Sequence, residues 1–170
     1  DSQAMHSIFR TKFLGLDGIF DHLFTPPTHE IDLSDPDLAD AVSEYDFRLN
    51  STEHHVLEKG EEKPNIDALR KILDKLDAST NECVYIGDNL FKDVRMAQDA
   101  FVSDVHADYG TAHTLDEYQL LIDVTHWTNE DVDREQKLKK AHVNPNVSVS
   151  KFFCELLEHF NFVGRGELHS

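Results

Sequence analysis

Hydrophobic residues along the chain recur at helical spacing in some stretches and form short continuous runs in others. Helical spacing predicts helices over residues 3–14, 66–76 and 150–160. The second is the clearest, and its apolar face consists of Ile66, Leu69, Ile72, Leu73 and Leu76. Residues 83–86 form an apolar run with β-branched and aromatic members, and Gly87 follows it. This run therefore predicts a buried strand.

The segments between these elements follow other patterns. Residues 22–25 predict a short strand that ends before two prolines, and residues 45–49 predict another. Residues 28–43 are acidic and irregular, which is typical of a solvated loop, and their spacing does not match an EF-hand. A helix is expected over 115–122, followed by an edge strand or buried turn at 124–127.

The chain divides into two predicted regions. Residues 1–130 contain the strands and the first helices named above and are expected to form one domain. Residues 131–170 are expected to form a helical extension, in which a break at 144–146 separates a charged helix from an amphipathic one. This extension either packs on the core or binds a partner, and packing is the default.

Composition and charge narrow the class of protein. The chain has 170 residues, of which 39% are hydrophobic, and this suffices for one globular core. Its 16 basic and 33 acidic residues give a net charge of −17, which argues against nucleic acid and anionic membranes as partners. No apolar run approaches the length of a membrane span, and no signal peptide is visible. Cys83 and Cys154 lie among apolar residues and are interpreted as core thiols, which suits a reducing cytoplasm.

Candidate chemistry appears directly after the predicted strand at 83–86. Gly87 permits a sharp turn and a close approach of a ligand, Asp88 follows on the loop, and Asp93 falls near the first turn of the next helix. Because open α/β sheets bind ligands at the carboxyl ends of their strands, both carboxylates are expected to face one small volume. Such a pair is stabilised by a shared proton or by a hard cation such as Mg²⁺. The alternative is that Asp93 caps a helix and Asp88 is a turn residue.

A lysine stands where a helix is expected to begin. Lys63 directly precedes Pro64, which suits a helix's first turn, and the amphipathic helix follows. The helix dipole disfavours positive charge at this end, so this is an unusual place for a cation. The alternative is a solvated surface lysine.

The order and separation of these features resemble the third and fourth motifs of the haloacid dehalogenase (HAD) superfamily of hydrolases: a Lys-Pro pair, an amphipathic helix, an apolar strand, and Gly-Asp with a later aspartate. Residues 14–24 are similar to the helix end and strand that this family places before its lysine motif. Residues 105–110 are similar to its next strand and loop. The resemblance covers roughly residues 1–128 and fades beyond residue 130. It implies an α/β, HAD-like Rossmannoid fold, in which helices flank a parallel sheet that is incomplete on its amino-terminal side.

The resemblance implies a phosphoryl-transfer site. In this family an aspartate on the first strand attacks phosphorus, a second aspartate two residues later protonates the leaving group, and water hydrolyses the aspartyl phosphate. On that pattern Asp88 would bind Mg²⁺, Asp93 would support the metal or Lys63, and Lys63 would pair with the nucleophile and the phosphate. The expected cofactor is therefore Mg²⁺, and the expected partner is a small phosphorylated substrate.

The chain departs from the family pattern at the first motif and at Phe101. The first motif, Asp-x-Asp-x-Thr or Asp-x-Asp-x-Val after an apolar run, does not occur, because residues 35–37 have the Asp-x-Asp spacing but not the strand. The second motif, a serine or threonine, would fall at Ser2 or at the residue immediately upstream. Phe101 stands where relatives usually carry glycine, so a turn is expected there at some local cost. We therefore expect this chain to be the carboxyl-terminal part of a longer HAD-like protein. Taken alone, the chain lacks the nucleophile.

Histidines offer a separate class of candidate sites. His54 and His55 are adjacent, so on a strand or helix their side chains point in different directions, which is poor geometry for a single ion. His106, Asp108 and His113 lie near the end of a predicted strand. They could bind zinc, although a substrate-binding loop is favoured there.

Two hypotheses of function follow. The first is a cytoplasmic, Mg²⁺-dependent HAD-like phosphatase, to which this chain contributes Lys63, Asp88, Asp93 and Ser2. The second is a HAD-like fold kept as a regulatory or interaction domain without turnover. The sequence predicts neither the identity of the substrate nor the oligomeric state.

Overall fold

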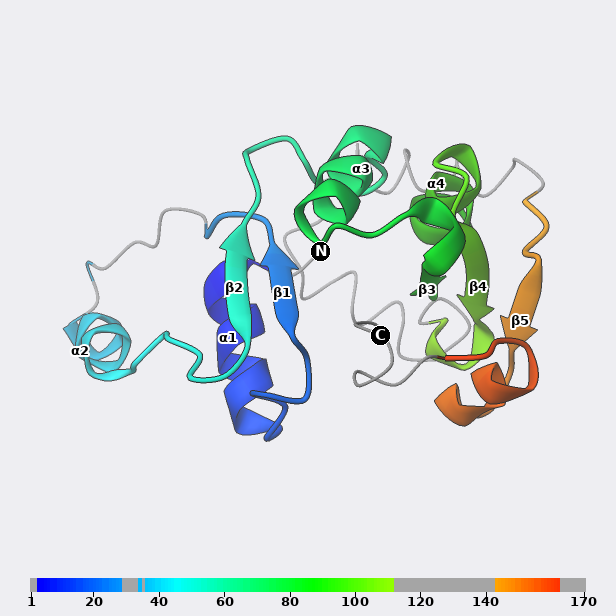
Figure 1. Ribbon diagram of the computed structural model, residues 1–170. Coiled ribbons are helices and arrows are strands. Elements are labelled where there is room, and N and C mark those ends of the chain that lie inside the picture. The colour runs from blue at the N-terminus through cyan, green and yellow to red at the C-terminus, as the bar shows by residue number, and fades with distance from the viewer. Residues whose placement is uncertain (1–2, 29–33, 35, 112–142, 163–170) are drawn as a thin grey trace. The chain divides into compact units, whose positions relative to one another are not determined.

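The computed structural model describes residues 3–28, 34, 36–111 and 143–162 (Figure 1). The chain splits into two compact units, Asp1–Glu62 and Lys63–Ser170. Both are built from helices and parallel strands, which confirms the predicted α/β class. The expected boundary at residue 130 lies outside the described residues and stays a prediction.

The first unit contains a two-stranded parallel sheet. Its elements are α1 (Ala4–Phe13), β1 (His22–Thr25), α2 (Pro36–Glu44) and β2 (Glu53–Val56). β1 and β2 pair in parallel, from His22 opposite Glu53 to Thr25 opposite Val56. The first helix and the first strand agree with the predictions for residues 3–14 and 22–25.

Two predictions for this unit are wrong. The acidic segment contains helix α2, because Pro36 suits the first helical turn and Asp37 there interacts favourably with the helix dipole. The second strand is not at 45–49 but at Glu53–Val56. In the former segment the Tyr45 ring packs at a tilt against the rings of Phe9 and Phe47, and no ladder forms.

The approach to each strand of this sheet is fixed by Asp17. Its carboxylate accepts backbone N–H hydrogen bonds from Asn50 (2.8 Å), Ser51 (3.0 Å) and Thr52 (3.0 Å). The hydrogen bonds from Asn50 and Thr52 lower the pKa of Asp17 below its usual value. The Thr52 hydroxyl also donates to the carbonyl of Phe20 at 2.9 Å. The segments entering β1 and β2 are thus tied together, which sets the register of the pair.

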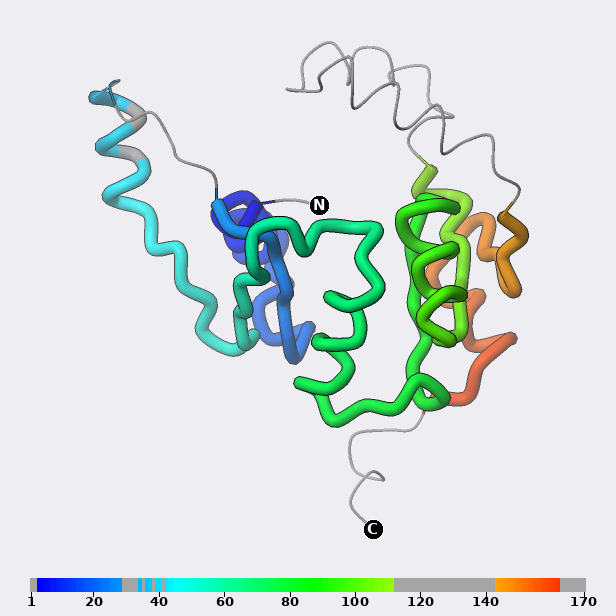
Figure 2. The backbone as a smooth tube through the Cα atoms, turned by 90° about the horizontal axis from the view of Figure 1, so that it is seen from above, coloured from blue at the N-terminus to red at the C-terminus, as the bar shows by residue number. Residues whose placement is uncertain are grey.

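The second unit is a three-stranded parallel sheet with helices. Its strands are β3 (Val84–Gly87), β4 (Ser103–Ala107) and β5 (Val147–Val149), in that spatial order. Its helices are α3 (Ile66–Lys75), η1 (Thr80–Glu82), η2 (Leu90–Val94), α4 (Arg95–Asp99), η3 (Asp108–Gly110) and η5 (Phe153–Glu158). α3 and α4 lie side by side (Figures 1 and 2).

Two groups of buried apolar side chains form the core of this unit. The first joins α3 and α4 and consists of Leu69, Leu73, Met96, Ala97, Ala100 and Val102. The second joins β4, β5 and η5 and consists of Val105, Ala107, Val149 and Leu156. The expected strand at 83–86 is confirmed, but its side chains are half-buried rather than buried.

The three α-helices whose caps the structure describes, α1, α3 and α4, end in the same way. The residue just past each cap has a positive φ: Gly15 (67°) after α1, Asp77 (50°) after α3 and Phe101 (60°) after α4. The next N–H in each case bonds to the carbonyl five residues before it, as in a Schellman motif. The turn expected at Phe101 without glycine is therefore present, and its ring is 81% exposed.

The carboxyl-terminal region differs from the predicted helical extension in containing strand β5. The buried Asp104 on β4 accepts hydrogen bonds from the backbone and the side chain of Asn146 and from Gln98. Gln98 also donates to the carbonyl of Asn144 at 2.8 Å. These bonds fix the approach to β5, a signal too distributed for sequence patterns to show. The amphipathic helix predicted at 150–160 is a shorter 3₁₀ helix, η5.

The elements predicted at 115–122, 124–127 and 129–141 lie outside the described residues. Among the helices that the structure does describe, none has the length and hydrophobicity needed to cross a bilayer.

Candidate functional site

The candidate site lies where β3 ends and η2 begins. Asn89 starts η2 by accepting the N–H groups of Phe91 (3.0 Å) and Lys92 (2.9 Å) on its side-chain oxygen. The Asn89 carbonyl accepts the N–H groups of Asp93 (2.9 Å) and Val94 (3.3 Å). This turn is π-helical, a widened geometry that is frequent at functional sites. It turns the Asp93 side chain into the protein.

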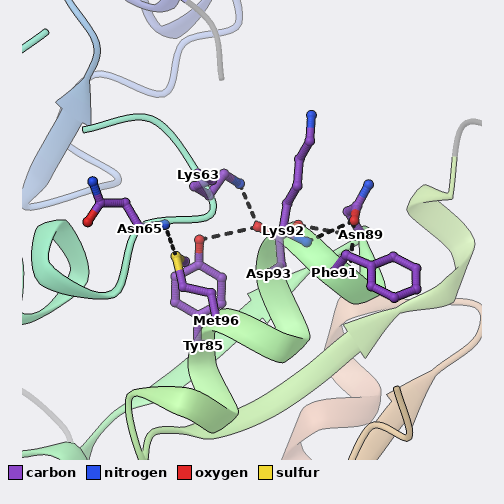
Figure 3. A network of polar contacts seen from close by, with 8 residues as sticks. All are labelled: Lys63, Asn65, Tyr85, Asn89, Phe91, Lys92, Asp93 and Met96. Carbon is purple, nitrogen blue, oxygen red and sulfur yellow. Dashed lines mark hydrogen bonds and ion pairs between the residues drawn. The ribbon is translucent and has the colours of Figure 1, made fainter. Parts of the chain in front are cut away.

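Asp93 is a buried carboxylate whose two oxygens both accept hydrogen bonds (Figure 3). Its Oδ1 accepts from Lys63 Nζ at 2.6 Å and from the Tyr85 hydroxyl at 3.3 Å, and its Oδ2 accepts from the Asn89 N–H at 3.1 Å. The Asp93 side chain is 2% exposed. Burying a carboxylate is costly unless it is paired and hydrogen-bonded, and these three donors meet that condition.

The turn requires glycine at position 87. A Cβ on Gly87 would stand 2.3 Å from both Cβ and Cγ of Asp93. No pair of carbon atoms tolerates that distance without displacement. Gly87 therefore allows the carboxylate of Asp93 to lie directly against the strand end.

Lys63, which lies just before α3, pairs with a buried carboxylate. Its partner is Asp93, and its side chain is 35% exposed, so the ammonium group pairs with a buried anion while part of the side chain remains accessible to solvent. Burial alone lowers the pKa of Lys63, but the neighbouring Tyr85 and Asp93 outweigh it and raise that pKa above its ordinary value. Lys63 is therefore charged at physiological pH.

The segment that follows Lys63 is anchored to α3 and α4. The Lys63–Pro64 peptide bond is cis. Asn65 caps α3 by accepting the N–H of Ala68 at 2.9 Å, and its own N–H lies 3.2 Å from the sulfur of Met96 (Figure 3). The start of α3 is thereby held to α4.

Tyr85 completes the environment of the pair, with its hydroxyl toward Asp93. Burial raises the pKa of Tyr85 to about 12, so the phenol keeps its proton at neutral pH and donates to Asp93. Tyr85 was interpreted from the sequence only as part of an apolar strand. Its position two residues before Gly87, on the same face of β3, is the signal that could have identified it.

Asp88 lies on the loop directly after β3 and is exposed. Its backbone is held from the end of the neighbouring strand, since its carbonyl lies 3.2 Å from His106 Nε2 and accepts the Thr111 hydroxyl at 3.4 Å. Gly110 packs against it, because a Cβ there would stand 3.1 Å from the Asp88 Cβ. The loop is thus supported while its carboxylate is presented to solvent.

The predicted site residues therefore have different environments. Lys63 and Asp93 are in direct contact, whereas Asp88 is exposed on the adjacent loop. Ser2 lies outside the described residues, as does His113. His106 is buried, and within the described residues its ring contacts the Asp88 carbonyl and the Thr111 hydroxyl, which suits a loop-supporting role.

A groove of about 720 Å³ is lined by residues that flank Lys63 and Asp93 in the sequence, among them Pro64, Asn65, Phe91 and Met96. It also holds two guanidinium groups, each beside an acid. Arg70 pairs with Asp67 at 3.6 Å, and Arg95 pairs with Asp99 at 2.9 Å. The groove thus combines apolar surface with locally neutralised charge.

Comparison with known proteins identifies one segment. Residues 61–119 match the family model described as HAD-hydrolase-like. This segment contains Lys63, Tyr85, Asp88 and Asp93. No curated protein matches the chain.

Proposed function

Residues 61–119 belong to the HAD superfamily of hydrolases, and on that premise we propose that the protein is a Mg²⁺-dependent phosphatase acting on a small phosphorylated metabolite. The contact between Lys63 and the buried Asp93 carries this proposal. Phosphoryl transfer depends mainly on positioning and on neutralising charge, and a fixed lysine supplies both.

Lys63 is suited to hold a phosphoryl group. An ammonium group has three N–H donors, and Asp93 accepts one of them at 2.6 Å. Tyr85 also interacts with the ammonium group, and we propose that the exposed part of the side chain leaves a remaining donor able to reach a phosphoryl oxygen. Asp93 then acts as a positioning residue, because it sets the direction and the charge of Lys63.

Asp93 and Asp88 have different roles in this proposal. Both oxygens of Asp93 already accept hydrogen bonds, and this favours support of Lys63 over direct binding of a metal. The exposed Asp88 offers the hard oxygen donor that Mg²⁺ prefers, with water completing the coordination shell. When bound, Mg²⁺ would neutralise charge on the phosphoryl oxygens.

The proposed reaction needs a nucleophile beyond the residues named so far. A first-strand aspartate would attack phosphorus while the bond to the leaving oxygen breaks, and a second aspartate would give that oxygen its proton. Water would then cleave the aspartyl phosphate to release inorganic phosphate. The Asp-x-Asp motif with the required strand does not occur in these 170 residues, so we propose that it lies upstream in the native polypeptide.

We propose that the groove accepts the organic part of a small substrate, although its lining consists of chain neighbours of Lys63 and Asp93 and does not include Lys63, Asp88 or Asp93. Its apolar lining suits the carbon skeleton of a metabolite, and its paired arginines avoid leaving isolated charge against it.

A HAD-like domain without turnover is the second candidate, and the missing first motif is the observation that favours it.

The test uses the native polypeptide, with its sequence upstream of Asp1 read by peptide sequencing. Phosphate release is measured for the wild type and for Lys63→Ala, Lys63→Arg and Lys59→Ala. We expect Lys63→Ala to lower kcat/KM by about 10²–10³-fold, the usual cost of losing one preorganised charge contact. Lys63→Arg should restore part of this loss, and the exposed Lys59 serves as the matched control.

Turnover by Lys63→Ala equal to that of Lys59→Ala would refute the role of Lys63. A native polypeptide with no upstream nucleophile and no phosphate release would identify the non-catalytic alternative.

A further inference from the structure

Three side chains with metal-binding atoms converge on one face of the β1–β2 sheet. Parallel pairing places His22 opposite Glu53 and Phe24 opposite His55. Because side chains alternate between faces along a strand, Glu53 and His55 share a face, and the register brings His22 to the same place. His54 is on the other face, where its Nε2 lies 2.9 Å from the Thr25 hydroxyl.

The three groups have the separations expected of ligands to one ion. His22 Nδ1 lies 3.1 Å from His55 Nε2 and 3.5 Å from a carboxylate oxygen of Glu53. His55 Nε2 lies 3.5 Å from the other carboxylate oxygen. In a tetrahedral zinc site with bonds of about 2.0–2.2 Å, neighbouring ligand atoms are about 3.3–3.6 Å apart. The two 3.5 Å contacts use different oxygens of Glu53, and one ligand atom from each residue lies within 4.8 Å of the other two. Small side-chain rotations therefore suffice to bring the three atoms to three corners of such a tetrahedron.

The surroundings hold the imidazole rings in place. His55 stacks on Phe24, with ring centroids 4.5 Å apart, and on His22, with centroids 5.3 Å apart. The His55 side chain is 10% exposed, whereas those of His22 and Glu53 are 34% and 64% exposed. The hydrogen bonds of Asp17 also fix the approach to both strands. Metal ligands on paired strands with stacked rings lose little freedom when they bind an ion.

We propose that His22, Glu53 and His55 bind a divalent transition-metal ion, with Zn²⁺ as the best-fitting member of this class. Imidazole nitrogen and carboxylate oxygen are ligands that zinc accepts, and two imidazoles disfavour Mg²⁺, which prefers oxygen. The exposure of His22 and Glu53 leaves the fourth position to water. This site is formed within the first unit and does not depend on the phosphatase proposal.

The adjacent residues His54 and His55 do not bind one ion together. His54 and His55 point to opposite faces, so the pair is poor geometry for an ion, as their adjacency predicts. The partner of His55 is instead His22, 33 residues earlier. The parallel register of two short strands had to be known before this cluster could be recognised.

The test is a calorimetric titration of Zn²⁺ into the 170-residue chain, purified without a histidine tag and freed of metal by a chelator. Variants are His22→Ala, His55→Ala and Glu53→Gln, and the exposed His6→Ala on α1 is the matched control. We expect one saturable site whose affinity falls by more than about a hundredfold in either histidine variant, since loss of even a ligand's supporting contact costs 10–100-fold. The control and an excess of Mg²⁺ should change nothing.

A second readout guards against unfolded variants. Glu53 is exposed, so Glu53→Gln should fold like the wild type by circular dichroism while binding Zn²⁺ more weakly. The ligand-field bands of bound Co²⁺ should have four-coordinate intensity in the wild type and weaken in Glu53→Gln. No saturable Zn²⁺ binding, or binding that His22→Ala and His55→Ala leave unchanged, would overturn the proposal.

Discussion

The position of Asp93 shows how one buried carboxylate can organise several neighbours. Lys63, Tyr85 and the backbone of Asn89 all donate to it, and each belongs to a different element: the segment before α3, strand β3 and the start of η2. A carboxylate with fewer donors would be expensive to bury, and the lysine without the carboxylate would be a cation at the unfavourable end of a helix. Lys63 and Asp93 thus stabilise each other in positions that would be unfavourable for either residue alone.

Gly87→Ala tests the contact between β3 and Asp93. The new methyl group would meet Asp93 at 2.3 Å, so we expect a loss of about 1–3 kcal/mol in the free energy of unfolding, the usual cost of overpacking. Urea denaturation of the chain measures it. Gly110→Ala is the control and should cost less, because its methyl group would meet the exposed Asp88 at 3.1 Å. Equal midpoints for wild type and Gly87→Ala would contradict the geometry.

The proton of Tyr85 gives a prediction about alkaline pH. Its pKa is about 12 in the folded chain, against an ordinary value of 10.0. Between these values the folded state binds more protons than the unfolded state, so stability is complete below about pH 10 and decreases as pH rises toward 12. The raised pKa of Lys63 acts in the same direction.

Urea midpoints at about pH 9 and about pH 11 for the wild type and Tyr85→Phe measure this effect. The midpoint should fall less with pH in the variant, whatever its stability at the lower pH. An equal fall in both proteins would mean that Tyr85 titrates normally.

At the scale of elements, the ends of helices show where the sequence conflicts with local preference. Gly15 occupies the left-handed position after α1 without strain, whereas Asp77 and Phe101 occupy the equivalent positions after α3 and α4. For residues other than glycine this conformation costs roughly 1–2 kcal/mol. The motif is formed nevertheless, because it satisfies carbonyl groups that the helix end would otherwise leave unpaired.

Phe101→Gly should therefore stabilise the chain. The ring is 81% exposed, so its removal loses little packing, and relief of strain outweighs the greater flexibility of unfolded glycine. We expect a gain of about 0.5–1 kcal/mol by urea denaturation. Gly15→Ala, with open space around its Cβ, should change stability in the opposite direction. A Phe101→Gly variant less stable than the wild type would show that the ring contributes more than its exposure indicates.

Sequence patterns predicted elements with strong periodicity and missed those fixed by distant contacts. Helix α3 and strand β3 could be predicted because their apolar residues recur regularly and because proline and glycine mark their ends. Strand β2 could not, since three of its four residues, Glu53, His54 and His55, are polar or ionisable and its position is set by Asp17. Strand β5 has three residues, too few for a periodic signal, and depends on the buried Asp104.

At the scale of the molecule, the two units carry separate candidate chemistry. The first holds the His22, Glu53 and His55 cluster, and the second holds Lys63, Asp88 and Asp93. The second set could be proposed from the sequence, because its members follow the ends of recognisable elements. Tyr85 and the group formed by His22, Glu53 and His55 could not be proposed in this way, since strand faces and register are needed to bring those side chains together.

The most direct test of the phosphatase proposal is the Mg²⁺ dependence of phosphate release by the native polypeptide, compared between the wild type, Asp88→Asn and the control Asp74→Asn. Asp88 is exposed, so its replacement leaves the fold intact, and Asp74 is a similarly exposed acid on α3 that does not line the groove. We predict that Asp88→Asn raises the Mg²⁺ concentration for half-maximal activity by more than about tenfold, while Asp74→Asn does not. An unchanged Mg²⁺ dependence in Asp88→Asn would contradict the proposed site.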